Sequence, residues 1–413
     1  MRINNTGAYE YCRWAIKQDR NSNPTLRDMG PNQWFQENLS QTRLAMLQGQ
    51  PPKECRNCEV MEQHGKVSGR QKQLLKTGVT VESFVPEMHS SPWFSEFRHS
   101  VISSGHTNQL PQDWQIDLGN FCNSACVFCT PHSSSRLATE YQKLGLLKQA
   151  PPRSWADDPK LVDKFMQDLV QAPILRYLHF IGGETLITPA FKTILQLLKH
   201  HNLHRDVTIG FTTNLTVWRQ DIVDLLLEFK SVNLGMSVEC LHPVNDYARY
   251  PSNIQQVQAI MDQWLSQCNQ LGWLPQIRIT PTILTVLHLD TIYQYAMQNQ
   301  IAVESCNFLD EPEFMRPSVL PPLLRQLAMA KLQRLDFGDV LSDRVINTRN
   351  RDIHNSQLQQ DCQSYINYLT HAPDESHRLP QLIEHLKILE NHRGNCVLDY
   401  VPEYEEFFRS AGY

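Results

Sequence analysis

The sequence has no long hydrophobic run. No window of its 413 residues approaches the ~18 consecutive apolar residues that a membrane-spanning helix requires. The opening residues, MRINNTGAYEYC, also lack the apolar core of a signal peptide. We therefore expect a cytoplasmic protein that has no membrane partner.

An excess of positive charge is absent as well. The chain has 38 Lys and Arg residues against 43 Asp and Glu residues, for a net charge of −5. A protein that binds nucleic acid mainly through its phosphates carries a basic surface instead. We expect no nucleic-acid partner.

The remaining composition is that of a globular protein. Hydrophobic residues make up 41% of the chain and charged residues 20%, and the length allows two or three domains. The 11 cysteines are not expected to form disulfides in a reducing compartment. Scattered cysteines are usually small buried hydrophobes, whereas clustered ones more often bind metal.

Six apolar stretches in the central part of the chain read as strands. Helical patterns lie between them: 157–171 begins with acidic capping residues, 189–201 has Pro in its first turn, and 255–272 ends at Gly. This alternation predicts parallel βαβ units and a sheet that is buried on both faces. The predicted strands are 114–119, 176–182, 206–213, 232–238, 276–282 and 302–309.

The flanks of this region differ from it in texture. Residues 1–75 are polar, 76–110 are rich in linker residues, and the chain after 310 is mainly helical. The central 111–310 is too short for a complete eight-unit barrel, which requires about 250 residues. It fits a partial barrel or an open doubly wound sheet.

The stretch NFCNSACVFCTP places three cysteines, Cys122, Cys126 and Cys129, directly after the first predicted strand. Their spacing also fits one face of a helix. However, the surrounding Gly, Asn, Ser and Pro favour a loop. A structural zinc site normally has four protein ligands, so three thiolates suit an iron–sulfur cluster with one position open.

This stretch resembles the C-x3-C-x-aromatic-C signature of the radical S-adenosylmethionine (radical SAM) enzymes, with Phe128 as the aromatic residue. The resemblance implies that the three cysteines hold a [4Fe–4S] cluster on the loop after the first strand of a partial (β/α)6 TIM-like barrel. It also implies that the fourth iron takes the amino and carboxylate groups of SAM.

Later strand ends carry further resemblances to this family. Gly182, Gly183 and Glu184 resemble its GGE motif, which implies that their backbone and carboxylate receive the SAM amino group. We expect glycines there because a Cβ would block the approach of a ligand. Thr213 and Asn214 stand where relatives carry Thr-Asn-Gly, but Leu215 replaces the glycine, so a different turn is expected.

The fourth predicted strand is followed by a run that resembles S-x-D-G…Y-x-R of peptide-modifying relatives. The resemblance places Ser237 and Arg249 at the SAM ribose and carboxylate. Glu239 stands where many relatives have Asp, and Cys240 where many have Gly. Glu239 is therefore a candidate cofactor contact without an assigned acid–base role.

The N-terminal region resembles the auxiliary-cluster modules called SPASM or twitch domains, here placed before the barrel. Those modules contain a G-x4-C hairpin and a later C-x2-C, which Gly7, Cys12, Cys55 and Cys58 match. The resemblance implies an auxiliary iron–sulfur cluster on the three cysteines. Zinc and unligated thiols remain alternatives, and the candidate fourth ligands are His64, Cys306, Cys362 and Cys396.

Together these features predict a partial (β/α)6 barrel over 111–310 with a SPASM/twitch-like module over 1–75, a linker over 76–110 and a helical region over 311–413. The resemblance implies reductive cleavage of SAM to a 5′-deoxyadenosyl radical, which abstracts a substrate hydrogen. A flavodoxin or ferredoxin would supply the electron. We expect a ribosomal peptide or protein as the substrate. A small metabolite is the alternative, and a zinc-stabilised binding protein is the non-enzymatic hypothesis.

Overall fold

The structure is a computed structural model. It describes residues 1–11, 23–50, 52–63, 68, 70–71, 103–107, 110–171, 175–304, 309, 311–338 and 349–413. Within these residues the chain forms one sheet of eight strands, in the order β2-β1-β3-β4-β5-β6-β7-β8. All neighbouring strands from β1 and β3 to β8 are parallel, and only β2 runs antiparallel to β1.

The six predicted strands are confirmed with small shifts at their ends. They pair in chain order, as consecutive βαβ units do. The observed strands are β3 (Asp113–Asp117), β4 (Tyr177–Ile181), β5 (Thr208–Thr213), β6 (Ser231–Ser237), β7 (Leu274–Arg278) and β8 (Ala302–Glu304).

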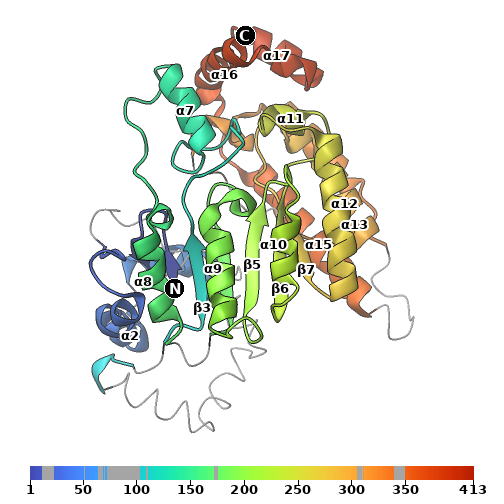
Figure 1. Cartoon of the computed structure of the whole chain (residues 1–413). Coiled ribbons are helices and arrows are strands. Elements are labelled where there is room, and N and C mark those ends of the chain that lie inside the picture. The colour runs from blue at the N-terminus through green and yellow to red at the C-terminus, as the bar shows by residue number, and fades with distance from the viewer. Residues whose placement is uncertain are drawn as a thin grey trace.

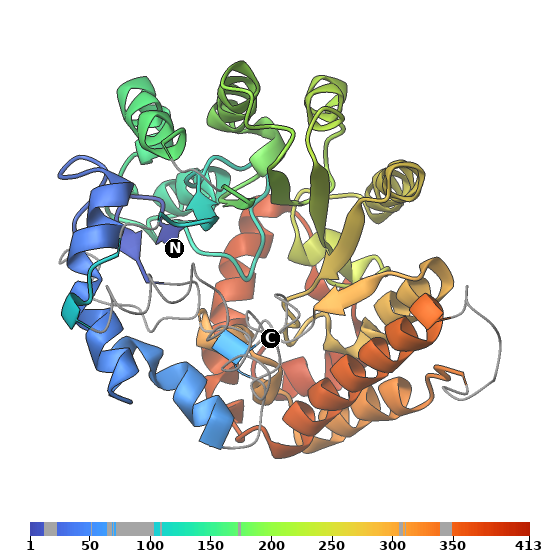
Figure 2. The same ribbon diagram turned by 90° about the horizontal axis from the view of Figure 1, so that it is seen from below.

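Helices connect the strands and cover the convex side of the curved sheet, as Figures 1 and 2 show. The residues predicted to begin and end helices do so. Asp158 begins one helix by accepting a hydrogen bond from the backbone N–H of Lys160, and Gly272 ends another in a left-handed conformation. The connecting helices are α7 (Ser135–Lys143), α8 (Pro159–Leu169), α9 (Pro189–His200), α10 (Gln220–Leu226), α11 (Val244–Ala248), α12 (Ile254–Leu271) and α13 (Asp290–Asn299).

The two faces of the sheet differ, which corrects the expectation that both are buried. Alternate residues such as Ile116, Phe180 and Phe211 are fully buried beneath the helices. Several residues between them, including Asp117 and Arg278, are polar and stay partly exposed on the concave face. The sheet therefore curves as a partial barrel whose inner face is polar.

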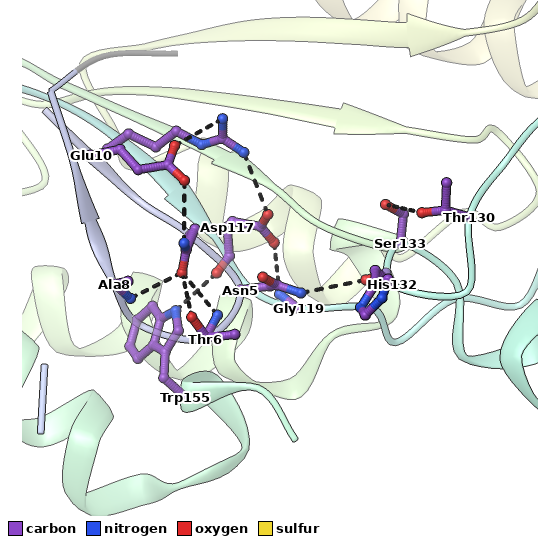
Figure 3. A network of polar contacts seen from close by, with 12 residues as sticks. Asn5, Thr6, Ala8, Glu10, Asp117, Gly119, Thr130, His132, Ser133 and Trp155 are labelled. Atoms are coloured by element: carbon purple, nitrogen blue, oxygen red, sulfur yellow. Dashed lines mark hydrogen bonds and ion pairs between the residues drawn. The ribbon is translucent and has the colours of Figure 1, made fainter. Parts of the chain in front are cut away.

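A short N-terminal hairpin extends the open edge of the barrel. Its strands are β1 (Arg2–Ile3) and β2 (Tyr9–Glu10), and β1 pairs with β3. Asn4 shapes the hairpin because its side-chain oxygen accepts hydrogen bonds from the backbone N–H groups of Thr6 and Ala8, each at 3.0 Å (Figure 3). The expected module boundary near residue 75 thus does not separate this hairpin from the barrel sheet.

The rest of the N-terminal region contains short helices. The stretch that follows the hairpin runs from α1 through the π-helix η1 to α2, and the two cysteines of CRNC lie where the 3-10 helix η2 passes into α3. These elements are α1 (Pro31–Gln33), η1 (Trp34–Asn38), α2 (Ser40–Leu47), η2 (Lys53–Cys55) and α3 (Arg56–Gln63).

The C-terminal region is helical, as predicted. Helix α15 packs beside β8 and α14 packs against α15, whereas α16 and α17 lie over the end of the barrel that carries α7 and α11 (Figure 1). The hydroxyl of Tyr404 donates to the backbone oxygen of Ile283 at 2.5 Å, which ties this region to the barrel. Its helices are α14 (Pro322–Gln333), α15 (Arg349–His371), α16 (Leu379–Arg393) and α17 (Glu405–Ser410).

Candidate functional site

The three clustered cysteines lie in the loop between β3 and α7. The loop has no helical turn at Cys122, Cys126 or Cys129, so the helix-face reading is wrong. Its middle is held against the end of α11 and the residues that follow it: the backbone N–H of Ala125 donates to the oxygen of Tyr250 at 2.5 Å, and that of Val127 to the oxygen of Ala248 at 2.9 Å. We call residues 118–134 the cysteine loop.

The thiols of this loop are close enough to influence one another. Burial raises the pKa of the Cys122 and Cys126 thiols to about 12 and that of Cys129 to about 11, and in each case the charge of a neighbouring cysteine adds to the effect. Without a metal the thiols are therefore protonated at neutral pH, and ligation would displace their protons.

The donor chemistry of the loop is that of an iron–sulfur cluster, which cysteine thiolates hold. Across the described parts of the chain, no three His, Cys, Asp or Glu side chains converge on a point where one metal ion could sit. In a cubane cluster each thiolate binds a different iron, so the three sulfur atoms need not converge on one point. Three thiols on one loop, each affected by the charge of a neighbouring cysteine, are a donor set of that kind.

The turn after β4 packs directly on the cysteine loop. Gly183 donates through its N–H to the oxygen of Gly119 at 2.7 Å, and Glu184 donates to the oxygen of Phe121 at 2.8 Å. A Cβ on Gly182 would lie 2.7 Å from the Gly119 oxygen, and one on Gly183 would lie 2.3 Å from the Phe121 oxygen. The glycines are thus required by contact with the cysteine loop, a steric reason that we did not infer from the sequence.

Glu184 is completely buried at the centre of this arrangement. Its carboxylate accepts hydrogen bonds from the backbone N–H of Leu186 at 3.1 Å and from that of Asn214 at 2.6 Å. Burial disfavours the charged form and raises the pKa of Glu184 to about 7, although these hydrogen bonds oppose the shift. The carboxylate joins the turn after β4 to the end of β5.

Asn214 continues the connection from β5 to the cysteine loop. Its Nδ2 donates to Oδ1 of Asn123 at 2.9 Å and to Oγ of Ser124 at 3.0 Å. Leu215, expected to change this turn, instead adopts the left-handed conformation with φ of 61° that glycine would take. That conformation costs a non-glycine residue roughly 1–2 kcal/mol.

Two further predicted residues, Glu239 and Arg249, form a buried ion pair. Arg249 donates through Nε to Oε1 of Glu239 at 3.1 Å, and the other carboxylate oxygen accepts from the backbone N–H of Thr280 at 2.6 Å. The Arg249 guanidinium also lies 5.5 Å from the centre of the Phe128 ring. Ser237 ends β6 beside this pair and is partly exposed. Cys240 is buried, and burial strongly raises the pKa of its thiol.

The N-terminal cysteine candidates are only partly described. Cys55 is partly exposed at the end of η2, and Cys58 is buried in α3. Cys12, His64 and Cys306 lie outside the described residues. Of the remaining candidate ligands, Cys362 is buried in α15 and Cys396 contacts the hydroxyl of Tyr413 at 3.3 Å. The auxiliary site therefore stays a prediction.

The sequence analysis did not predict the polar concave face of the sheet. Arg278 on β7 reaches across the sheet and donates through Nη1 to Oγ1 of Thr212 at 3.1 Å, and the same nitrogen lies 3.1 Å from Nε2 of His179. Its Nε lies 3.3 Å from Glu304 on β8. The signal was present as single polar residues between apolar ones in the predicted strands.

A second part of this face connects the N-terminal hairpin to the cysteine loop. Arg2 lies 3.2 Å from Glu10 and 3.9 Å from Asp117, and Asp117 accepts from the backbone N–H of Gly119 at 3.0 Å. Figure 3 shows Asp117 between Glu10 and Gly119, with Asn5 reaching the backbone oxygen of His132. The hairpin thereby contacts the cysteine loop directly at His132 and is connected to its other end through Asp117.

Comparisons with known proteins place the barrel segment in context. Residues 116–265 match the model of the Radical SAM superfamily. The matched segment runs from β3 into α12 and includes the cysteine loop, the turn after β4 and Arg249. A search of curated proteins found no match, and no helix in the described residues is long and apolar enough to cross a membrane.

Several solved structures also resemble the chain. One is Streptococcus suis SuiB bound to precursor peptide SuiA, with 15% identity over 50% of this chain and 40% of that chain, at a TM-score of 0.33. Native anSMEcpe with bound AdoMet has 15% identity over 53% of this chain and 59% of that chain, at a TM-score of 0.39. A third is the radical S-adenosylmethionine methyltransferase TsrM from Kitasatospora setae, with cobalamin and a [4Fe–4S] cluster bound. It has 14% identity over 46% of this chain and 34% of that chain, at a TM-score of 0.32. The chain thus spans less than two thirds of each, and these scores are too low to establish a common overall fold.

Proposed function

We propose that this chain is a radical SAM enzyme that modifies a peptide or protein. The observation that carries the proposal is the set of backbone and side-chain bonds that join the cysteine loop to the ends of β4 and β5. Cys122, Cys126 and Cys129 would hold a [4Fe–4S] cluster on this loop. When bound, the cluster supplies an electron that cleaves SAM to methionine and a 5′-deoxyadenosyl radical, which abstracts a substrate hydrogen atom.

In this proposal the residues around the loop bind and orient SAM. Glu184 offers a buried carboxylate for the SAM ammonium group, and the glycine turn keeps that carboxylate next to the loop. Arg249 is positioned for the SAM carboxylate: Glu239 takes its Nε and Nη2, so Nη1 is the nitrogen that would meet it. Thr213, Asn214 and Ser237 lie at neighbouring strand ends and would contact the rest of the cofactor.

Glu239 has a positioning role rather than an acid–base role. Both of its oxygens are engaged, one by Arg249 and one by the backbone of Thr280. A buried guanidinium requires such a partner because an unpaired buried charge is costly. Glu239 would therefore hold Arg249 in place beneath the Phe128 ring.

The substrate would bind against the polar concave face. The hydroxyl of Thr212 and the amide of Asn233 face this side and can hydrogen-bond a peptide backbone. The charges of Arg278 and Glu304 on adjacent strands also favour a second candidate, a small metabolite such as an amino acid with both an ammonium and a carboxylate group. A large apolar substrate fits neither set of groups.

The metal content tests the proposal against the non-enzymatic alternative. Protein purified without oxygen should be brown and rich in iron, with iron lost from the Cys122→Ala, Cys126→Ala and Cys129→Ala variants. Colourless protein with stoichiometric zinc would instead support a zinc-stabilised binding protein. The substrate class is tested by mass spectrometry of candidate peptides and amino acids incubated with reduced protein and SAM, where a mass change in the peptide alone supports our proposal.

A further inference from the structure

A hollow on the outer surface of the barrel end lies directly behind the cysteine loop. It has a volume of about 280 Å³ and opens between α7 and the C-terminal end of α16. We call it the α7 hollow. It is lined by Arg136, Thr139, Glu140, Lys143, Tyr250 and His392.

The wall of the hollow is built on a buried ion pair. Arg393 at the end of α16 has a side chain only 2% exposed and donates to both oxygens of Glu140, at 2.8 and 2.6 Å. Its guanidinium also lies 4.5 Å from the centre of the Tyr250 ring, and that of Arg136 lies 5.9 Å from the same ring. These bidentate and cation–π contacts give the hollow a defined shape.

The same side chains hold the cysteine loop. Arg136 donates to the backbone oxygen of Asn123 at 3.1 Å, and Arg393 donates to that of Ala125 at 2.8 Å. Asn123 and Ala125 are the chain neighbours of Cys122 and Cys126. A protein seated on the hollow would therefore lie against the outer side of the loop that carries the cysteines.

The charge of the hollow differs in sign from that of the chain. Glu140 is neutralised by Arg393, so the exposed Arg136 and Lys143 give the rim a positive charge, and His392 lies beside them. The whole chain carries a net charge of −5. A cationic patch on an acidic protein attracts and orients an acidic partner, because the rest of the surface repels it.

We propose that the α7 hollow and its rim, Arg136, Lys143 and His392, dock a small acidic electron-carrier protein that reduces the cluster. This inference rests on the proposed function. The reduced carrier loses one electron at its flavin or iron–sulfur centre, the cluster gains that electron, and no atoms are transferred. A carrier docked here would reach the loop without entering the polar concave face, where we propose that the substrate binds.

The decisive experiment compares two reductants on variants of surface lysines. Lys143→Glu reverses a charge on the rim, and a Thr139→Glu/Lys143→Glu double variant strengthens the reversal. Lys160→Glu on α8 makes the same charge change away from the hollow. The formation of 5′-deoxyadenosine from SAM is measured with reduced flavodoxin and with dithionite, and iron content and melting temperature confirm that each variant is intact.

With flavodoxin, the concentration that gives half-maximal rate should rise about tenfold in Lys143→Glu and further in the double variant, at low salt. With dithionite, all variants should match the wild type, and Lys160→Glu should match it with both reductants. Equal losses with both reductants, or no loss with flavodoxin, would overturn the docking site. Wild-type protein that is inactive with dithionite would instead contradict the proposed function. In that event the direct binding of flavodoxin to wild type and to Lys143→Glu decides the docking question, and equal affinities reject it.

Discussion

Nδ2 of Asn214 lies 2.9 Å from Oδ1 of Asn123, and this hydrogen bond joins the end of β5 to the cysteine loop. The same amide group donates to Oγ of Ser124, and both acceptors follow Cys122 directly in the chain. The loop is therefore positioned by a side chain that is more than ninety residues away in sequence. Its geometry depends on the barrel being folded.

Replacing this side chain should loosen the loop. Asn214→Ala removes two donors to partly or fully buried acceptors, so we expect a loss of about 1–3 kcal/mol in the free energy of unfolding. Chemical denaturation of the iron-free protein measures it. Asn391→Ala, at an exposed position on α16, should change stability by less than about 0.5 kcal/mol. Equal effects in the two variants would show that the Asn214 bonds do not hold the loop.

Glu184 should couple SAM binding to pH. The pKa of Glu184 is raised to about 7 in the protein without SAM, and a cationic ammonium group nearby would lower it. Below pH 7, SAM binding would then release a proton from Glu184. The affinity for SAM should therefore rise with pH by at most about tenfold per pH unit, and should level off above pH 7. Calorimetry at pH 6 and 8 in buffers of different ionisation enthalpy measures both the affinity and the released proton.

The Glu184→Gln variant provides the control for this coupling. It should weaken SAM binding by roughly 1.5–3 kcal/mol, as expected for a lost charge-assisted hydrogen bond, and should bind SAM with no dependence on pH in this range. The iron content should stay unchanged. A variant that binds SAM normally but loses its iron would assign Glu184 a structural role alone.

The Glu239–Arg249 pair should be far more important for stability than an exposed pair of similar geometry. Glu239→Ala leaves a mostly buried guanidinium without its partner, so we expect a loss of about 3–5 kcal/mol. The matched control is Glu228→Ala, which breaks an ion pair with Lys199 in which both side chains are 40% or more exposed. That change should cost at most about 1 kcal/mol. Similar losses in the two variants would contradict the role of Glu239 as the support of Arg249.

The N-terminal cysteines predict a second cluster. If Cys12, Cys55 and Cys58 hold an auxiliary iron–sulfur cluster, the wild-type protein should contain roughly eight iron atoms per chain rather than about four. The triple variant with Ala at Cys122, Cys126 and Cys129 should then keep about half of the iron and a reducible cluster signal. A folded triple variant without iron would assign the N-terminal thiols to zinc or to no metal.

The strand and helix pattern of the barrel was predictable because its signals are local. The apolar run at 177–181, the Asp158 cap of α8 and the Gly272 end of α12 each act within a few residues. The resemblance at Gly7 and Cys12 implied a hairpin near the N-terminus, but its strands β1 and β2 were not predicted, because each is two residues long and shows no periodicity. Its place in the sheet depends on pairing with β3, which is distant in sequence.

The candidate site was predictable as a set of residues but not as a set of contacts. The spacing of the three cysteines and the position of Gly182–Glu184 after a strand marked the site. The pairing of Glu239 with Arg249 was not visible, because it depends on how α11 folds back between them. The polar concave face was also missed, because a parallel sheet with helices usually buries both faces, and single residues such as His179 were read as ordinary strand positions.

The central claim is that Cys122, Cys126 and Cys129 hold a cluster that cleaves SAM. The most direct measurement is the formation of 5′-deoxyadenosine by reconstituted protein with dithionite and SAM, without added substrate. Wild type and Cys268→Ala, which removes a buried thiol on α12 far from the loop in sequence, should form it. Each of Cys122→Ala, Cys126→Ala and Cys129→Ala should form none, and turnover at the wild-type rate in all three would contradict the account.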